Sequence, residues 1–194
     1  MEEEPLNKNF DYNFSDLIGK RTLIKGDVGT GKTRLTESLL RKAAEGFPTG
    51  HITVIDLAPE RISTGMYLVG GTMSVPNEIK YLRPSKIWAP RLEGRTKEEV
   101  ILLAKANAEA IEAVFDIFKK TPTPILFIND LTIYLHAGPL ERLIEVIKMA
   151  DTFVGNAYEG LGLKDDKGSG ISERERSLLK KLEGSMNIVI DLNR

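Results

Sequence analysis

The feature that most constrains the fold of this chain is a glycine-rich stretch near the amino terminus. Its residues are Gly26, Asp27, Val28, Gly29, Thr30, Gly31, Lys32 and Thr33. They fit the pattern Gly-x-x-x-x-Gly-Lys-Ser/Thr at every fixed position, which predicts a phosphate-binding loop. A β-prone run over 22–25 precedes the loop, and Leu35, Leu39 and Ala43 follow on one face of an expected helix over 32–45. Strand, tight loop and helix are the context that this pattern requires.

The residue types in this loop have complementary roles in binding a di- or triphosphate. Glycine allows φ angles and close approaches that side chains would block, so successive N–H groups can point at phosphate oxygens at the positive end of a helix. Lys32 would supply positive charge to the β- and γ-phosphates, and the Thr33 hydroxyl would ligate a bridging Mg²⁺ ion. The sequence therefore predicts binding of Mg²⁺ and ATP, with GTP as a second candidate. A glycine-rich turn that fits by chance is the alternative.

The composition indicates one globular domain over 1–194 and excludes several chemistries. Of the 194 residues, 41% are hydrophobic and 28% are charged, which is ordinary for a globular chain. There are no cysteines, so disulfides, thiolate metal sites and cysteine nucleophiles are excluded. A formal net charge of −1 gives no overall electrostatic case for nucleic acid. Because the amino terminus is acidic and no apolar run is long enough to span a bilayer, we expect a cytoplasmic protein with no membrane partner.

A second β-prone run predicts a buried strand that ends in a carboxylate. Residues 51–56 are mostly apolar or β-branched and end in Asp56. With the first strand and helix, this run predicts a βαβ unit of a parallel sheet. Ligands of open α/β sheets collect at the carboxyl ends of the strands, so we expect Asp56, Glu60 and Arg61 to lie near the glycine-rich loop.

A third run, over residues 124–130, predicts another strand with an acidic end. Four apolar residues are followed by Asn129 and Asp130, which is typical of a Walker B strand. We expect this strand beside the one that leads into the glycine-rich loop, with the Asp130 carboxylate directed at Mg²⁺ or at an attacking water. Without the loop, an ordinary buried strand with a solvated end would be the better interpretation.

The remaining sequence predicts alternating helices and strands. Thr96 and Glu99 have the spacing of a capping box at the start of a long helix that ends near residue 121. Ser172 and Glu175 repeat that pattern at the start of a later helix. Further elements are expected as a helix from residue 139, a strand over 152–157 and a last strand over 187–191.

Three segments interrupt this alternation. They are an amino-terminal extension over 1–19, an irregular insertion over 57–95 and a glycine-rich loop over 160–170 that we expect to be mobile. Within the insertion, residues 86–89 are the one expected strand. Aromatic residues alternate in the extension, which predicts an extended segment that covers the edge of the core or stacks on a nucleotide base. These residues are Phe10, Tyr12 and Phe14.

Taken together, these motifs resemble the RecA-like branch of the P-loop NTPases. The stretch from Asp16 to Thr33 is similar to the start of KaiC-type and RecA-type ATPase cores. The second half is also similar in layout to cobalamin adenosyltransferases and to small thermophilic nucleoside-triphosphatases. The resemblance implies a three-layer α/β fold, in which helices flank a mainly parallel central sheet, and a nucleotide-hydrolysing activity.

The chain departs from these families where the Walker B strand ends. Many of these ATPases end that strand with Asp, often followed by Glu, whereas here Asn129 takes the first place and Asp130 the second. Either Asp130 takes the metal role and no carboxylate follows it, or it acts as the base and the metal lacks its usual partner. In RecA-like and KaiC-like enzymes the base follows the second strand, where Asp56 or Glu60 could match it. Slow hydrolysis, or binding without turnover, follows from this departure.

The leading hypothesis is therefore hydrolysis of ATP or GTP. Lys32 would neutralise the phosphates, and Thr33 and Asp130 would hold Mg²⁺. Glu60 or Asp56 would activate water. An arginine from this chain, or from a second copy in a homo-oligomer, would stabilise the transition state, although each candidate alone is expected to be a solvated charge. The candidates are Arg61, Arg91, Arg174 and Arg176.

Two other classes of function stay open. One is a nucleotide-dependent switch with little turnover, in which the nucleotide orders residues 57–95 or 160–170 for a protein partner. Basic residues in these segments permit a nucleic-acid partner without arguing for one. The other is a small-molecule kinase or nucleotidyl transferase, whose acceptor these residues do not identify.

Overall fold

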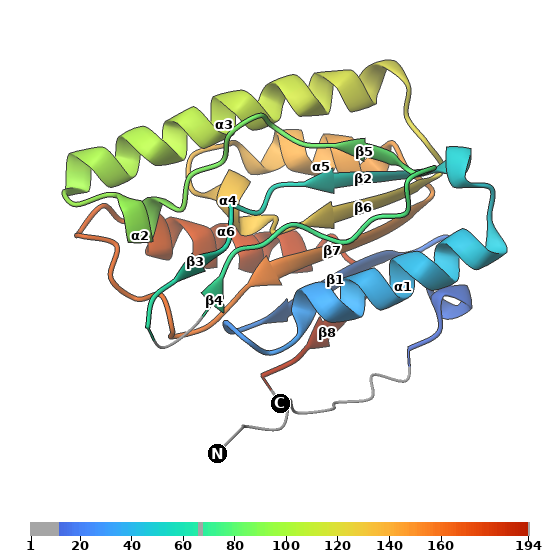
Figure 1. Cartoon of the computed structure of the whole chain (residues 1–194), viewed down its shortest axis with the longest axis horizontal. Coiled ribbons are helices and arrows are strands. Elements are labelled where there is room, and N and C mark those ends of the chain that lie inside the picture. The colour runs from blue at the N-terminus through green and yellow to red at the C-terminus, as the bar shows by residue number, and fades with distance from the viewer. Residues whose placement is uncertain (1–11, 66–67, 194) are drawn as a thin grey trace.

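A six-stranded sheet forms the centre of the molecule (Figure 1). The computed structural model describes residues 12–65 and 68–193. The strands are β1 Arg21–Gly26, β2 Ile52–Asp56, β5 Lys80–Leu82, β6 Ile125–Asn129, β7 Thr152–Tyr158 and β8 Ile188–Asp191. They lie in the order β5-β2-β6-β7-β1-β8, and every neighbouring pair is parallel. The expected parallel sheet is therefore confirmed.

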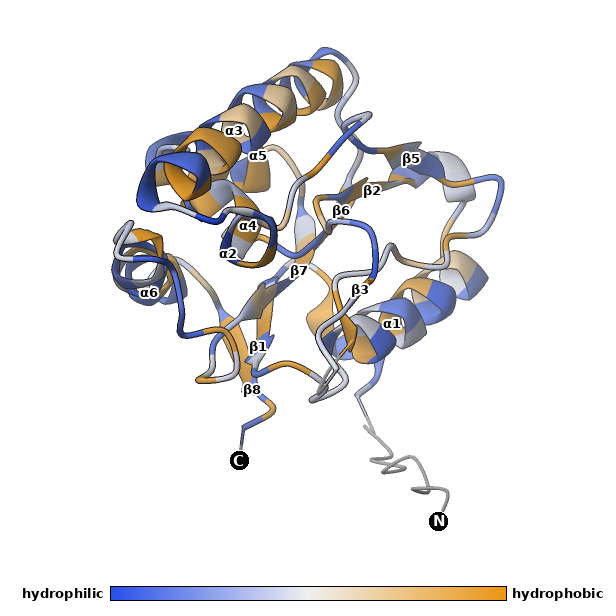
Figure 2. Cartoon of the chain, turned by 60° about the vertical axis from the view of Figure 1, so that its left-hand side comes forward, coloured by the Kyte–Doolittle hydropathy of each residue, from blue (hydrophilic) through white to orange (hydrophobic). Residues whose placement is uncertain are grey.

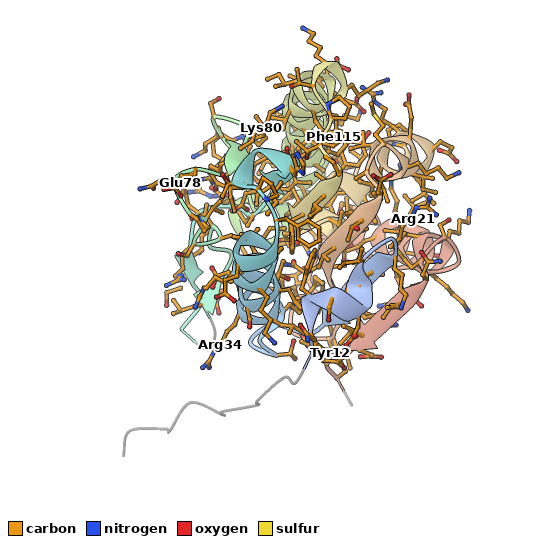
Figure 3. All side chains as sticks on the ribbon, turned by 90° about the vertical axis from the view of Figure 1, so that its right-hand side faces the viewer. Tyr12, Arg21, Arg34, Glu78, Lys80 and Phe115 are labelled. Atoms are coloured by element: carbon orange, nitrogen blue, oxygen red, sulfur yellow. The ribbon has the colours of Figure 1, made fainter. Side chains whose placement is uncertain are left out.

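Helices cover both faces of the sheet and complete a three-layer α/β architecture (Figure 2). The helices are η1 Phe14–Leu17, α1 Lys32–Gly46, η2 Thr49–His51, α2 Pro90–Glu93, α3 Lys97–Lys120, α4 Thr132–Leu135, α5 Leu140–Lys148 and α6 Ile171–Glu183. Successive strand residues point to opposite faces, so Leu23 of β1 packs under α3 to α6 while Ile24 packs under α1 and η1. Phe115 of α3 is buried in the larger layer (Figure 3). None of the described helices has the length and apolar character needed to cross a bilayer.

The strand that precedes Asp130 is not beside β1, because β7 lies between β1 and β6. The expectation of direct neighbours was wrong, since a run of apolar residues carries no information about strand order. All seven residues of β7 are buried, as they must be in a strand covered by helices on both faces. The carboxyl ends of the strands share one edge of the sheet, at the left in Figure 1, and the glycine-rich loop lies on that edge.

The start of the described chain is folded rather than extended. Phe14 is buried in the 3₁₀ helix η1, where its ring contacts Phe47 edge-on and stacks on Phe127 at centroid distances of 5.9 Å. Tyr12 is 39% exposed. The extended segment predicted from the alternating aromatic residues is therefore wrong at Phe14, which lies in a helix and covers the edge of the core. Phe10 lies outside the described residues.

The insertion over 57–95 contains more regular structure than its sequence predicts. Strands β3 Ile62–Ser63 and β4 Leu68–Val69 form an antiparallel pair, and β5 adds to the main sheet beside β2. The strand expected over 86–89 is absent. The Asn107 side chain instead accepts from the Trp88 N–H and donates to the Trp88 carbonyl, both at 2.9 Å, so a side chain satisfies the backbone there.

The two expected capping boxes have different outcomes. Thr96 caps α3 as expected, because its hydroxyl accepts from the Glu99 N–H at 3.2 Å. At α6 the expectation is wrong: the helix begins at Ile171, and its N-cap residue is Gly170, whose φ is 81° and which has no side chain to accept a hydrogen bond. The Asp166 carboxylate accepts from the Ser172 N–H at 3.1 Å, which leaves Glu175 free to point into the interior.

Candidate functional site

A cavity of about 270 Å³ opens over the glycine-rich loop at the carboxyl edge of the sheet. Its walls come from the loop and the first turn of α1, from the ends of β6 and β7, and from the β3–β4 pair. Lys32, Thr33 and Asp130 all line it. Three of the residues expected to handle phosphate and magnesium therefore share one cavity, although 97 positions separate Thr33 from Asp130.

The loop has the backbone geometry that its glycines predict. Gly31 lies directly before α1 with a φ of 92°, and no side chain caps the helix. A Cβ at Gly26 would lie 2.6 Å from Thr30 Oγ1, so the turn requires glycine there as well. An uncapped helix start leaves backbone N–H donors for an anion. Arg34 is exposed at the rim of the cavity (Figure 3).

Lys32 is held inside the loop. Its Nζ donates to the Asp27 carbonyl at 2.6 Å and lies 5.9 Å from the centre of the Tyr158 ring. Burial lowers the pKa of Lys32, and the nearby Asp130 and Asp27 carboxylates oppose that shift. A bound phosphate would add negative charge beside the ammonium group and favour its charged form.

Asp130 has a left-handed backbone and lines the cavity. Its φ is 57°, a conformation that costs a non-glycine residue about 1–3 kcal/mol. Oδ1 accepts from the Thr132 hydroxyl at 3.0 Å, whereas Oδ2 has no hydrogen-bond partner among the described residues. Burial raises the pKa of Asp130, and the Thr132 hydrogen bond and the Lys32 charge reduce the shift.

These residues fit a magnesium ion bound together with a nucleotide. Within residues 12–65 and 68–193 there is no group of three or more acidic or histidine side chains that would hold a metal by itself. Mg²⁺ in nucleotide sites needs only one or two protein oxygens, because phosphates and water supply the rest. The Thr33 hydroxyl and the Asp130 carboxylate are such oxygens, and both line the cavity.

Asp56 and Glu60 lie outside this cavity. Asp56 is fully buried at the end of β2, where its carboxylate accepts four hydrogen bonds. The Glu60 side chain is 74% exposed and pairs with Arg83 at 2.9 Å. The structure therefore brings Lys32, Thr33 and Asp130 together, and places the two expected base candidates elsewhere.

The four candidate arginines differ in their surroundings. Arg91 is buried, contrary to the expectation of a solvated charge, and forms two hydrogen bonds to Glu175 at 2.7 and 3.0 Å. Arg174 donates to backbone carbonyls at the end of α4, and Arg176 is exposed. Arg61 is exposed beside the cavity wall, since a Cβ at Gly71 would lie 3.2 Å from Arg61 Nε.

Sequence reasoning missed a buried charged cluster beside the cavity. His136 Nε2 lies 2.6 Å from the Glu175 carboxylate and 3.2 Å from the Arg91 guanidinium. That guanidinium also lies over the Tyr158 ring, 5.2 Å from its centre, so both Arg91 and Lys32 lie close to this ring. The cluster joins residues 39 to 84 positions apart, and no local pattern could have indicated it.

A second cavity of about 540 Å³ lies on the other side of Tyr158 and Leu163, which line both spaces. Its walls come from the end of β7, the following loop and α6. The exposed cations Lys164 and Arg176 line it, and neither has a partner among the described residues. This space adjoins the phosphate-loop cavity and has room for a further group or molecule.

Asp27 ties the segment after β7 to the glycine-rich loop. Its carboxylate accepts from the N–H groups of Leu161 at 2.8 Å and Gly162 at 3.2 Å. Burial alone would raise the pKa of Asp27, but these backbone donors outweigh it and lower the pKa. A Cβ at Gly160 would lie 2.1 Å from Asp27 Cγ, so this contact requires glycine at position 160.

The fold and the site define a three-layer α/β protein with a glycine-rich loop at the carboxyl edge of a parallel sheet. No protein-family model and no curated protein matches the chain. The flagellar accessory protein FlaH from Methanocaldococcus jannaschii is similar over 90% of this chain and 71% of its own, with 11% identity and a TM-score of 0.47. A protein from Pyrococcus horikoshii OT3 is similar over 94% of this chain and 88% of its own, with 12% identity and a TM-score of 0.43. Likenesses this distant do not decide function.

Proposed function

We propose that this protein binds a nucleoside triphosphate with Mg²⁺ at the glycine-rich loop and hydrolyses it slowly, with ATP as the expected nucleotide and GTP as the second candidate. One observation carries this proposal. The uncapped start of α1, the Lys32 ammonium group, the Thr33 hydroxyl and the Asp130 carboxylate all surround one cavity. This set supplies donors for phosphate oxygens and oxygen ligands for a hard cation.

Each of these groups has one part in the proposed reaction. The loop N–H groups and Lys32 hold the phosphates and stabilise the charge that develops on them. Thr33 and Asp130 would hold Mg²⁺, which neutralises the β- and γ-phosphate oxygens when it is bound. Tyr158 and Leu163 form the wall that limits access of water from the side of α6.

Slow turnover follows from the number of carboxylates in the cavity. Asp130 is the one carboxylate that lines it among the described residues, so orienting water and holding Mg²⁺ would both depend on this group. Glu60 would have to leave Arg83 to reach the cavity, and Asp56 is occupied by four donors. A single carboxylate with two tasks is expected to catalyse less well than a separate ligand and base.

Nucleotide binding and Mg²⁺-dependent phosphate release from ATP and GTP test the proposal, with Lys32→Ala as the test variant. We expect the wild-type chain to release phosphate and Lys32→Ala to lose release and most of its binding. Lys42→Ala is the matched control, because Lys42 is on the same helix and, among the described residues, its Nζ hydrogen-bonds to the Tyr12 carbonyl alone, at 2.7 Å. Equal binding by the wild type and Lys32→Ala would contradict the proposal.

The second cavity favours one alternative, a small-molecule kinase or nucleotidyl transferase. A space of about 540 Å³ beside the loop would admit an acceptor, and Lys164 and Arg176 would attract an anionic one. Such an enzyme would release little phosphate alone and would consume ATP faster when its acceptor is present. Arg176→Ala should then raise the acceptor KM without changing nucleotide binding. A protein partner or a homo-oligomer that responds to the nucleotide is compatible with either chemistry.

A further inference from the structure

Buried polar side chains join the carboxyl ends of three neighbouring strands. Asp56 ends β2, Asn129 ends β6 and Asn156 lies in β7, with exposures of 0%, 1% and 2%. Asn129 Nδ2 donates to Asp56 Oδ1 and Asn156 Nδ2 donates to Asn129 Oδ1, each at 2.8 Å. The Asp130 backbone N–H in turn donates to Asn156 Oδ1 at 2.9 Å.

This chain of hydrogen bonds runs in one direction. Every donor points from Asp130 towards Asp56, and the chain ends at a carboxylate, which accepts and cannot donate when ionised. An acceptor at that end fixes which way the Asn129 amide faces, and Asn129 then fixes Asn156. The Asp56 carboxylate at one end and the Asp130 N–H at the other therefore require the same direction.

The other contacts of Asp56 explain why it stays in place. Its carboxylate also accepts from the Met73 N–H at 2.7 Å, the Ala58 N–H at 3.1 Å and the Tyr81 hydroxyl at 3.0 Å. These donors come from the insertion and from the edge strand β5. A carboxylate held by four donors is a fixed acceptor.

The chain of hydrogen bonds also reaches the glycine-rich loop. Asn156 Nδ2 donates to Thr36 Oγ1 at 3.0 Å, and that hydroxyl donates to the Lys32 carbonyl at 2.9 Å. Both amide protons and the amide oxygen of Asn156 are thus occupied. Asn156 is consequently not available to contact a γ-phosphate, and its role is to connect α1 with Asp130.

We propose that Asp56 is a positioning residue that holds the Asp130 backbone in its left-handed conformation through Asn129 and Asn156. Asn129 is essential because a carboxylate there could not donate to Asp56 and would repel it at 2.8 Å. The asparagine at the first Walker B place thus belongs to the support of the metal-binding residue. This inference rests on the proposed function, since it gives Asp130 its task.

Exchanging the donor at position 129 with the acceptor at position 56 tests the direction of the hydrogen-bond chain. Asn129→Asp alone breaks the donation to Asp56, and we expect kcat to fall and the half-saturating Mg²⁺ concentration to rise, each by about tenfold, as for a lost buried hydrogen bond to a charged group. Nucleotide affinity without Mg²⁺ should change much less. Adding Asp56→Asn lets an amide at position 56 donate to the carboxylate at position 129, so the double variant should regain part of both losses.

Hydrogen exchange of the Asp130 amide gives a readout that needs no nucleotide. It should be faster in Asn129→Asp than in the wild type and should slow again in the double variant. If the double variant merely adds the two single losses, or if exchange at Asp130 stays unchanged in Asn129→Asp, the positioning role is wrong. If instead the wild type binds no nucleotide while exchange behaves as expected, the proposed function fails and the positioning of Asp130 stands.

Two further variants separate positioning from general stability. Thr123→Val removes a buried hydroxyl that contacts Thr53 Oγ1 at 2.9 Å, at the amino ends of β2 and β6. It should lower the Tm without raising the Mg²⁺ requirement. Tyr81→Phe removes the outermost donor to Asp56 at a 39% exposed residue, so it should fold even if Asn129→Asp does not. An unchanged Mg²⁺ requirement in Tyr81→Phe together with a raised one in Thr123→Val would overturn the proposal.

Discussion

At the scale of single residues, Asp130 combines an unusual backbone with an unusual ionisation. Its φ of 57° is maintained by the Asn156 amide, and burial raises its pKa above the ordinary value of 3.8. A raised pKa means that the carboxyl group keeps its proton to a higher pH than an exposed aspartate does. Magnesium competes with that proton, because only the ionised form is a strong ligand.

We therefore expect Mg²⁺ binding in the presence of nucleotide to weaken as the pH is lowered, beginning above the range in which ordinary aspartates titrate. Isothermal titration at a series of pH values would measure it. In Asp130→Asn the same titration should show weak binding with no acid dependence from this group. An identical pH profile in both proteins would contradict the assignment of Asp130 to the metal.

The same raised pKa has a consequence for stability. The folded state holds this proton more tightly than the unfolded state, so the ionised Asp130 carboxylate lowers stability at neutral pH; this cost begins to shrink as the pH falls to the folded pKa and is gone below the unfolded pKa. The difference in unfolding free energy between Asp130→Asn and the wild type should therefore shrink towards acidic pH.

Only part of this site is predictable from residues read in order. The glycine-rich loop is local, so its pattern predicts Lys32 and Thr33 directly, and the apolar run before Asp130 predicts that carboxylate. The hydrogen bonds of Asp56 to Asn129 and of Asn129 to Asn156 join positions 73 and 27 apart. Whether a buried carboxylate is a base or an acceptor depends on its donors, and only the folded chain supplies them.

At the scale of elements, a buried ion pair connects α2 of the insertion with α6. The Arg91 and Glu175 side chains are 7% and 5% exposed, and His136 completes the cluster from the end of α4. Burial alone would raise the pKa of Glu175, but His136 and Arg91 outweigh it and lower the pKa. The pair thus holds the insertion against the helix that borders the second cavity.

Removing one partner of this pair should be costly. We expect Glu175→Gln to lower the free energy of unfolding by about 3–5 kcal/mol, because the Arg91 charge would be left buried without compensation. Urea unfolding at neutral pH measures this. Glu173→Gln, an exposed position on the same helix, is the control and should change stability by less than about 0.5 kcal/mol. Equal effects of the two variants would mean that the cluster does not stabilise the fold.

Glu175 also shows why element boundaries were harder to predict than elements. Ser172 and Glu175 have the spacing of a capping box, yet the Asp166 carboxylate takes the N–H of Ser172, and Glu175 turns inward to Arg91. The continuous apolar run of β6 and the helical spacing of apolar residues in α3 are local patterns, and both elements follow from them. Irregular segments such as 86–89 depend on distant partners, here Asn107.

At the scale of the whole molecule, the fold class was predictable and the strand order was not. Alternating strands and helices predict a parallel sheet between two helix layers, because parallel strands need crossover connections. The position of β7 between β1 and β6 is set by packing along the full chain. The cavity over the loop depends on that order, since Asn156 and Tyr158 of β7 both line it.

A ligand that binds this edge of the sheet should stabilise the entire fold. At 100 times its Kd, Mg²⁺ with ATP should raise the free energy of unfolding by about 2.7 kcal/mol. For a chain of this length, each kcal/mol of added stability raises the Tm by about 2–4 °C. Thermal unfolding by circular dichroism, with GTP and tripolyphosphate beside ATP, measures it. A shift as large with tripolyphosphate as with either nucleotide would show that the base adds nothing to binding.

The sheet order also governs how the site can form during synthesis. The glycine-rich loop is made early, but β1, which leads into it, pairs on one side with residues 152–158 and on the other with residues 188–191. While the chain leaves the ribosome, β1 therefore has neither neighbour until residues 152–158 have been translated. The apolar faces of β1 and α1 are expected to need protection from aggregation in that interval, and the loop gains its full support only after residues 188–191 have been translated.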